Sequence, residues 1–260
     1  MPLLPTSFGS LYYELSGPAD APVLVLSNSL GTDHTMWNAQ VPALATDFRV
    51  LRYDTRGHGQ SSVPPGPYAV ADLGQDVLAL LDGLEIGQAH FCGLSLGGLT
   101  GQWLGIHAPG RLHRLVLSNT AVKIGDAAGW DARIAQVQRE GLAPLAEATA
   151  GRWFRPVFRR TQPAEVARIL RTFAATAPAG YAACCAAVRD ADFWQAVRQI
   201  PVRTQVFAGD ADPVTTEAAG RYLEQHIPRA HLVVLRAAHL ANVEAAAPFT
   251  AALRRFLLNK

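Results

Sequence analysis

One short segment constrains this chain more than any other: positions 91–98 read FCGLSLGG. An apolar run precedes the serine and a helical stretch of small residues follows it, which predicts a strand, a tight turn and a helix. Gly93 and Gly97 lie two residues on either side of Ser95, where a Cβ atom would clash as strand and helix pack closely. We therefore predict that Ser95 is a nucleophile. The alternative is a glycine-rich turn before a buried helix.

The bulk composition is that of a compact protein. The 260 residues are 49% apolar and 17% charged, which suits one α/β domain with an insertion or two small domains. A formal charge of +2 gives no reason to expect a nucleic-acid partner. No apolar run approaches the ~20 residues that cross a bilayer, so we expect no membrane association. The sequence leaves the oligomeric state open.

Cysteine usage and the N-terminal segment predict a cytoplasmic protein. The segment MPLLP lacks both the basic region and the long apolar region of a signal peptide. The three cysteines are Cys92, Cys184 and Cys185, and an odd number with two adjacent gives no disulfide framework. None has the spacing of a metal ligand, so no metal is expected.

Short apolar runs bounded by turn residues alternate with helical segments along most of the chain. The predicted strands are 22–26, 48–53, 89–92, 112–117, 204–207 and 232–235, and the clearest helices are 73–84 and 96–107. This alternation predicts an α/β fold, a mostly parallel sheet flanked by helices. A leading strand at 11–15 is expected to be antiparallel.

The alternation stops after Asn119 and resumes near position 193. Residues 121–192 are helical and alanine-rich, which predicts a helical cap inserted between two parts of one core, 1–120 and 193–260. The insertion carries ten basic and seven acidic residues, so the chain's positive excess lies there.

A nucleophilic serine needs a base that takes its proton and a third group that orients the base. In an open α/β sheet, these partners lie in loops after the carboxyl ends of strands. Two such loops carry suitable side chains: Asp210 and Asp212 after the strand 204–207, and His239 after the strand 232–235. The resulting order, serine then acid then histidine, is typical of this architecture.

Ester hydrolysis through a serine also needs two N–H donors for the oxyanion. Leu96 follows the nucleophile at a helix N-terminus, where the helix dipole favours negative charge. The second donor is expected from the loop 27–31, and we nominate the N–H of Leu30. The alternative is a plain turn.

A second glycine-rich motif, DTRGHGQS at 54–61, leaves another strand at the same edge of the sheet. Its paired charges predict a fixed loop in which Asp54 and Arg56 hold neighbouring backbone rather than take part in catalysis. His58 in this motif and His34 near the first long strand are further candidates to line the site.

With these residues in place, the chain resembles the α/β-hydrolase family over essentially its full length, and within it the 3-oxoadipate enol-lactonases. The matching stretches are SNSLGTDHTMW (27–37), RYDTRGHGQSS (52–62), GLSLGGLTGQWLG (93–105) and AAHLANVE (237–244). Most relatives have a histidine–glycine pair where this chain has Asn28-Ser29, a departure that fits the lactonases. The GDADP run resembles the family's acid loop, which implies Asp212 rather than Asp210 as the acid.

The resemblance implies hydrolysis of 3-oxoadipate enol-lactone to 3-oxoadipate in the β-ketoadipate pathway of aromatic catabolism. It implies an acyl-enzyme on Ser95, with Asp212 and His239 as partners and no cofactor. A general carboxylesterase or a C–C bond hydrolase of ring-fission products would use the same three residues. The non-enzymatic alternative is a ligand receptor of the same fold.

This lactone carries a free carboxylate, which needs a cation or several hydrogen-bond donors. Arg152 and Arg155 of the cap are candidates, because an arginine can bind a carboxylate through two parallel hydrogen bonds. Trp153 would cover the ring, and Trp37 is a further candidate for substrate contact. The alternative is that the arginines are solvated and the aromatic side chains pack in the core.

Overall fold

The computed structural model describes residues 2–259 and contains one eight-stranded sheet with the order β1-β2-β4-β3-β5-β6-β7-β8. The strands are β1 (Leu3–Thr6), β2 (Gly9–Ser16), β3 (Val23–Ser27), β4 (Arg49–Tyr53), β5 (Ala89–Leu94), β6 (Leu112–Ser118), β7 (Thr204–Gly209) and β8 (Ala230–Leu235). β1 and β2 are antiparallel to their neighbours, and the other six strands run parallel. The predicted α/β class and the antiparallel leading strand, now β2, are confirmed.

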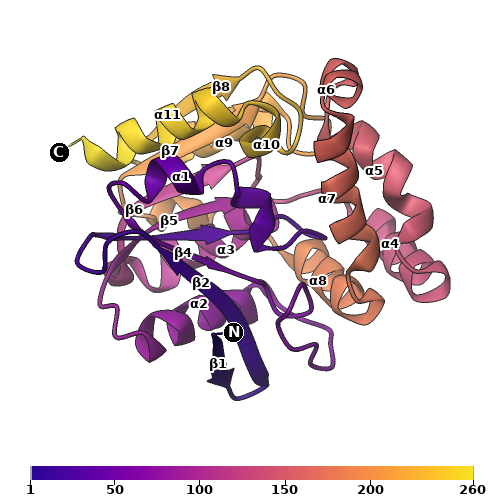
Figure 1. Ribbon diagram of the computed structural model, residues 1–260, viewed down its shortest axis with the longest axis horizontal. Coiled ribbons are helices and arrows are strands. Elements are labelled where there is room, and N and C mark those ends of the chain that lie inside the picture. Colours follow the sequence, from indigo (N-terminus) through magenta and orange to yellow (C-terminus); the bar gives the residue numbers. More distant parts are fainter. Residues whose placement is uncertain (1, 260) are drawn as a thin grey trace.

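The central strands are apolar along their whole length because both faces of the sheet are covered. Every residue of β3, β5 and β7 is buried. Helices α1 (Val41–Leu44) and α11 (Ala246–Leu258) pack together on one face, while α2 (Val70–Gly83) and α3 (Leu96–His107) pack together on the other (Figure 1). Helix α9 (Glu217–His226) packs against β7 and β8, and α10 (Ala241–Glu244) precedes α11.

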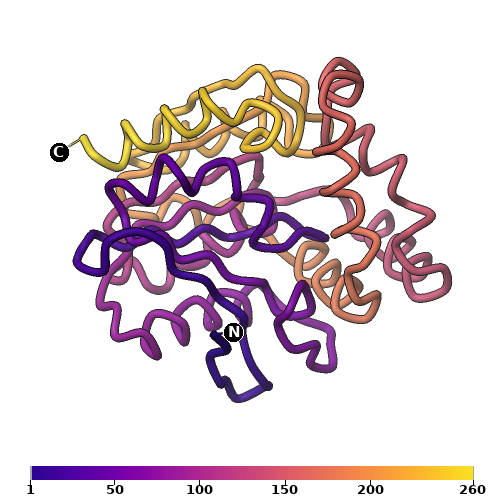
Figure 2. Tube along the Cα trace, in the orientation of Figure 1, coloured from indigo at the N-terminus to yellow at the C-terminus, as the bar shows by residue number. Residues whose placement is uncertain are grey.

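Five helices interrupt the sheet between its neighbouring strands β6 and β7. They are α4 (Ala127–Glu140), α5 (Ala146–Trp153), α6 (Pro156–Thr161), α7 (Pro163–Ala175) and α8 (Pro178–Asp190). All of them fall within residues 121–192, which we call the cap. Figure 1 shows these helices gathered at one end of the sheet, and Figure 2 shows the chain leaving after β6 and returning for β7.

The cap lies over loops that leave the carboxyl ends of the strands. The N–H of Leu240, after β8, donates to the carbonyl of Trp153 in α5 over 3.1 Å. The N–H of Tyr68, in the connection after β4, donates to the carbonyl of Ala183 in α8 over 3.2 Å. A space enclosed by the cap therefore borders these loops. Within residues 2–259, every helix is too short or too polar to cross a lipid bilayer.

Candidate active site

Ser95 occupies a strained turn between β5 and α3. Its φ of 58° and ψ of −107° lie where side chains are rarely found. A Cβ atom on Gly93 would lie 2.0 Å from the carbonyl oxygen of Gly97, and one on Gly97 would lie 2.4 Å from the carbonyl oxygen of Ser27. Only glycine fits at these positions, for the reason that the sequence suggested. The turn presents the Ser95 hydroxyl at the carboxyl end of β5.

His239 and Asp212 face each other in neighbouring loops. The Nδ1 atom of His239 lies 2.9 Å from Oδ2 of Asp212, and both side chains are buried. Burial alone would raise the pKa of Asp212, but the charge of His239 and hydrogen bonds from His239, Asn119 and Thr215 together lower it. Asp212 is therefore held as a carboxylate. Its hydrogen bond to Nδ1 leaves Nε2 of the imidazole available to another partner.

The carboxylate of Asp212 accepts further hydrogen bonds that fix its position. Backbone N–H groups of Val214 and Thr215 donate to Oδ1 over 2.8 and 3.0 Å. The Thr215 hydroxyl and the Asn119 amide donate to Oδ2 over 2.7 and 3.0 Å. Asp210, the alternative acid, accepts instead from the N–H of Ala237 over 3.1 Å. The hydrogen bonds therefore bring Asp212, and not Asp210, against the imidazole.

Ser95 and His239 border one cavity between the core and the cap. Its other lining residues are Ser29, Leu30, Ile124, Trp130, Arg133, Thr149, Arg152, Trp153, Tyr181, Val188 and Val214. Two predicted cap residues, Arg152 and Trp153, are among them. The wall opposite the serine thus combines aromatic rings with two guanidinium groups.

The two nominated backbone donors are buried beside this cavity. Leu30 is 8% exposed and Leu96 is 1% exposed. In the part of the chain that the structure describes, neither N–H donates a hydrogen bond. Buried N–H groups without an acceptor are rare in folded proteins, so both amides are available to a bound anion.

Two predicted substrate contacts lie elsewhere. Trp37 is fully buried in the core, where its Nε1 donates to Oδ1 of Asn28 over 3.0 Å and its ring packs on Phe249. Arg155 is bound to Glu244, with Nε 2.6 Å from Oε1. Neither residue lines the cavity, because Trp37 packs in the core and Arg155 joins the cap to the core.

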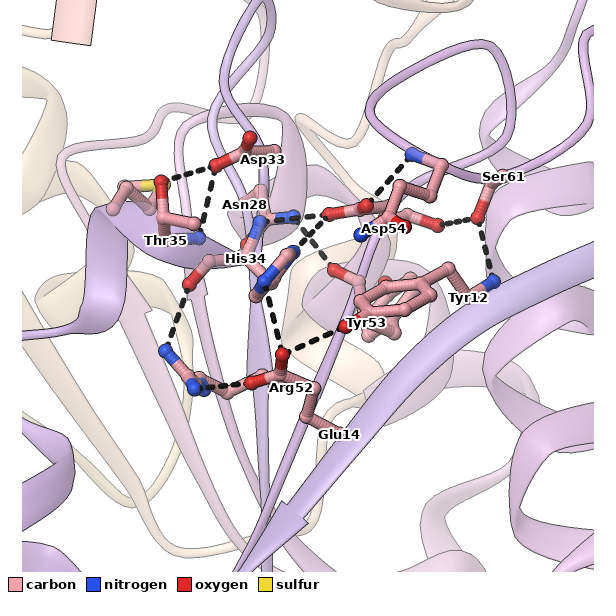
Figure 3. Close-up of polar contacts among 12 residues, drawn as sticks. Tyr12, Glu14, Asn28, Asp33, His34, Thr35, Arg52, Tyr53, Asp54 and Ser61 are labelled. Atoms are coloured by element: carbon pink, nitrogen blue, oxygen red, sulfur yellow. Dashed lines mark hydrogen bonds and ion pairs between the residues drawn. The ribbon is translucent and has the colours of Figure 1, made fainter. Parts of the chain in front are cut away.

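The histidines His34 and His58 also lie outside the cavity lining. Figure 3 shows His34 within a polar network around Asp54, whose Oδ1 accepts from its backbone N–H and contacts its Nδ1, both over 2.8 Å. Asp54 also accepts from the N–H of Gln60 over 2.9 Å. Arg56 is held by the carboxylate of Asp76 on α2 at 2.6 Å. These residues fix the loops around the site.

Sequence reasoning missed Arg133. Its Nη1 is buried without a hydrogen-bond partner, and it forms no ion pair with a carboxylate among residues 2–259. Arg152 donates to the hydroxyl of Thr149 over 3.0 Å and likewise has no carboxylate partner among these residues. Burial and the charge of Arg133 lower the pKa of Arg152. A bound anion would offset this repulsion, and only the packing of α4 distinguishes Arg133 from the cap's other basic residues.

Comparison with known proteins supports this geometry. Residues 22–246 match the sequence profile of the family described as the alpha/beta hydrolase fold. The chain belongs to the α/β-hydrolase family. It is 46% identical to 3-oxoadipate enol-lactonase 2 of Acinetobacter baylyi, over 95% of this chain and 94% of that protein.

Two solved structures are similar in both fold and sequence. The crystal structure of an enol-lactonase from Burkholderia xenovorans superimposes with a TM-score of 0.98 at 43% identity, covering 99% of this chain and 100% of that one. A hydrolase from Pseudomonas aeruginosa gives a TM-score of 0.96 at 50% identity, covering 99% and 98%. Within residues 2–259, no group of His, Cys, Asp and Glu side chains is placed to hold a metal ion.

Proposed function

We propose that this protein hydrolyses 3-oxoadipate enol-lactone to 3-oxoadipate, a reaction of the β-ketoadipate pathway. The observation that carries the proposal is one cavity with a nucleophile elbow at one wall and two carboxylate-free guanidinium groups in its lining. The enol-lactone has both parts that such a cavity would recognise, an acyl carbon and a free carboxylate. The names of the similar proteins from Acinetobacter and Burkholderia support the same substrate.

In the first half of the reaction, Ser95 is acylated. Nε2 of His239 takes the hydroxyl proton as Oγ attacks the lactone carbonyl, and Asp212 stabilises the imidazolium that forms. The N–H groups of Leu30 and Leu96 hold the oxyanion of the tetrahedral intermediate. Collapse of the intermediate breaks the ring C–O bond, and the imidazolium returns the proton to the departing oxygen.

The departing oxygen belongs to an enol, which leaves more readily than a simple alkoxide. It stays tethered to the acyl group, and its conversion to a ketone removes the nucleophile that could close the ring again. Water activated by His239 then attacks the acyl-enzyme and releases 3-oxoadipate. Each step uses protein groups and water, so no cofactor is needed.

The cap recognises the substrate's free carboxylate. Arg133 and Arg152 bind it, and Trp153 packs against the lactone ring. Because the two guanidinium groups are partly buried and have no carboxylate partner among the described residues, one anion improves the electrostatics of both. Arg155 and Trp37 take no part in this recognition, since both are engaged outside the cavity.

The proposal is tested by mixing the purified protein with enzymatically generated enol-lactone and following the loss of its ultraviolet absorbance. We expect rapid turnover by the wild type and none above background for Ser95→Ala. Ser16→Ala, on β2 at a distance from the cavity, is the matched control and should retain full activity. Equal rates for the wild type and Ser95→Ala would contradict the proposal.

A comparison of substrates separates the alternative activities. A general carboxylesterase would prefer a p-nitrophenyl ester to the enol-lactone, and a C–C bond hydrolase would turn over a ring-fission dienoate. A ligand receptor of the same fold would turn over none of the three. The two guanidinium groups favour the small anionic lactone over an uncharged ester.

We place the reaction in the cytoplasm. Cys92, Cys184 and Cys185 are buried and unpaired, as is usual where thiols stay reduced.

A further inference from the structure

His58 contacts the loop that carries the Leu30 N–H, although it lies outside the cavity. Its side chain is buried, and Nε2 accepts a hydrogen bond from the N–H of Gly31 over 3.0 Å. Because an amide nitrogen only donates, Nε2 carries no proton. The proton is therefore on Nδ1, 3.3 Å from the carbonyl oxygen of Arg56. The contacts define one tautomer of a neutral imidazole.

Two successive peptide units of this loop, which we call the oxyanion loop (residues 28–32), are fixed by hydrogen bonds. The carbonyl of Ser29 accepts from both the N–H and the hydroxyl of Thr32, over 3.2 and 2.7 Å. In a trans peptide the N–H points opposite to the carbonyl, so the N–H of Leu30 points away from Thr32. The next peptide unit is held through Gly31 by His58. Leu30 lies between these two fixed points.

The cap packs directly against this arrangement. Gly31 has a φ of +77°, and a Cβ atom on it would lie 2.7 Å from the ring of Phe173 in α7. A Cβ atom on Gly57, next to His58, would lie 2.7 Å from the Cα atom of Gly180 in α8. The ring centre of Tyr181 is 6.4 Å from that of His58. His58 therefore lies between the cap and the oxyanion loop.

We propose that His58 is a positioning residue, which holds the oxyanion loop so that the Leu30 N–H meets the developing negative charge. The inference rests on the proposed hydrolase function. It assigns a role in catalysis to the second glycine-rich motif, for which the sequence predicted a structural role alone. His58 touches no reacting atom and acts through Gly31.

The surroundings of His58 keep its imidazole neutral. Burial lowers its pKa, and this effect exceeds the opposing influence of the Arg56 carbonyl and of the carboxylates of Asp54 and Asp33. The thiol of Cys184, 4.0 Å from Nδ1, is also kept protonated because burial raises its pKa. A proton on Nε2 would set two N–H groups against each other and break the bond to Gly31.

The test compares His58→Leu with His58→Gln, using the proposed lactone as substrate. Leucine cannot accept the Gly31 N–H, so we expect kcat to fall by about 10- to 100-fold, since loss of one oxyanion donor costs ~10²–10³. KM should change little, because the arginines that bind the carboxylate are untouched. The side-chain oxygen of glutamine replaces Nε2, and His58→Gln should recover most of kcat. His58→Asn, whose side chain is too short to reach Gly31, should resemble His58→Leu and serves if that variant fails to fold.

A second readout distinguishes positioning from general loss of packing. Phenylboronic acid forms a tetrahedral adduct with a serine hydroxyl and so uses the oxyanion donors, whereas 3-oxoadipate binds as a ground-state product. We expect His58→Leu and His58→Asn to weaken boronate binding about as much as they lower kcat, and to leave product binding nearly unchanged. His90→Leu, which removes another buried histidine at the far end of β5, is the control and should alter neither.

Folded His58→Leu or His58→Asn protein with wild-type kcat and wild-type boronate affinity would overturn the inference. So would equal losses of boronate and product affinity. These results are distinct from failure of the proposed function, which would appear as a wild-type protein that does not hydrolyse the lactone. If the wild type then hydrolyses p-nitrophenyl acetate, the same variants are compared on that ester, with the same outcomes deciding.

Discussion

At the scale of single residues, Asn119 links the loops of the acid and the histidine. It is one of the few described non-glycine residues with a positive φ, 42°, and it follows the last residue of β6. Its Nδ2 donates to Oδ2 of Asp212 over 3.0 Å and to the carbonyl of Ala238 over 3.2 Å. One amide thus sets the distance between the carboxylate and the residue before His239.

Replacing Asn119 should impair chemistry more than binding. We expect Asn119→Ala to lower kcat about 10-fold, the usual loss for one hydrogen bond to a charged group, with KM for the lactone nearly unchanged. Steady-state kinetics check this. Ser118→Ala, which removes only the hydroxyl that donates to Oδ1 of Asn119, should have a smaller effect. A raised KM with normal kcat would show that Asn119 acts on binding instead.

Arg133 gives a second prediction at this scale, with the opposite kinetic signature. Arg133→Met keeps the packing of the side chain but removes its charge, so KM for the enol-lactone should rise about 100-fold, within the ~2–5 kcal/mol expected for a buried charge pair. Turnover of uncharged p-nitrophenyl acetate should stay within a few-fold of wild type. Arg139→Met, on the exposed face of the same helix, is the control. An unchanged KM for the lactone would remove Arg133 from the binding site.

At the scale of elements, the predictable parts of the fold are those whose sequence reflects burial on both sides. The central strands were found within two residues at most of their ends because buried parallel strands are nearly continuous apolar runs. The predicted helix 96–107 coincides with α3. β1 was missed because its four residues alternate between exposed and half-buried and include Pro5, which carries no strand signal.

The same distinction applies to the site. Asp212 and His239 could be found because each follows the carboxyl end of a strand, and strand ends can be read from the sequence. Arg133 could not be found, because its direction depends on how α4 packs against α8. Helix α8 is buried along most of its length, so no periodic face in its sequence shows where α4 lies.

Close contact between α8 and the glycine-rich loop after β4 can be tested with a pair of helix glycines. A Cβ atom on Gly180 would lie 2.2 Å from the carbonyl oxygen of Gly57, and backbone cannot yield easily. We expect Gly180→Ala to lower the free energy of unfolding by about 1–3 kcal/mol. Gly151→Ala, at an open position of α5, should be neutral or stabilising by up to about 1 kcal/mol. Denaturant titration measures both, and equal effects would contradict the contact.

At the scale of the whole molecule, the sheet separates catalysis from acid sensitivity. Ser95 lies at the carboxyl end of β5, and His90 lies near the opposite end of the same strand. Nδ1 of His90 is buried without a hydrogen-bond partner. Burial, together with the charges of His113 and Arg114, lowers the pKa of His90 to about 4. The folded protein therefore disfavours its protonation.

This pKa predicts how stability depends on pH. The folded-state pKa lies below the unfolded value of about 6.5, so the unfolded chain binds the proton more readily. The full contribution is present above pH 6.5 and is lost as pH falls toward 4, by up to about 3 kcal/mol. His90→Leu should remove this part of the acid destabilisation, as unfolding free energies at pH 7 and pH 4.5 would show. Parallel losses in the wild type and the variant would contradict the assignment.

The central claim is that loops from across the chain meet at one edge of the sheet and make Ser95 a nucleophile. Rapid quenching of the wild type with enol-lactone, followed by peptide mass spectrometry, tests this most directly. Because ring opening expels no fragment, the account predicts that the peptide containing Ser95 gains the full mass of the lactone, and that Ser95→Ala gains none. Turnover with the adduct on another residue, or with the same adduct in Ser95→Ala, would contradict it.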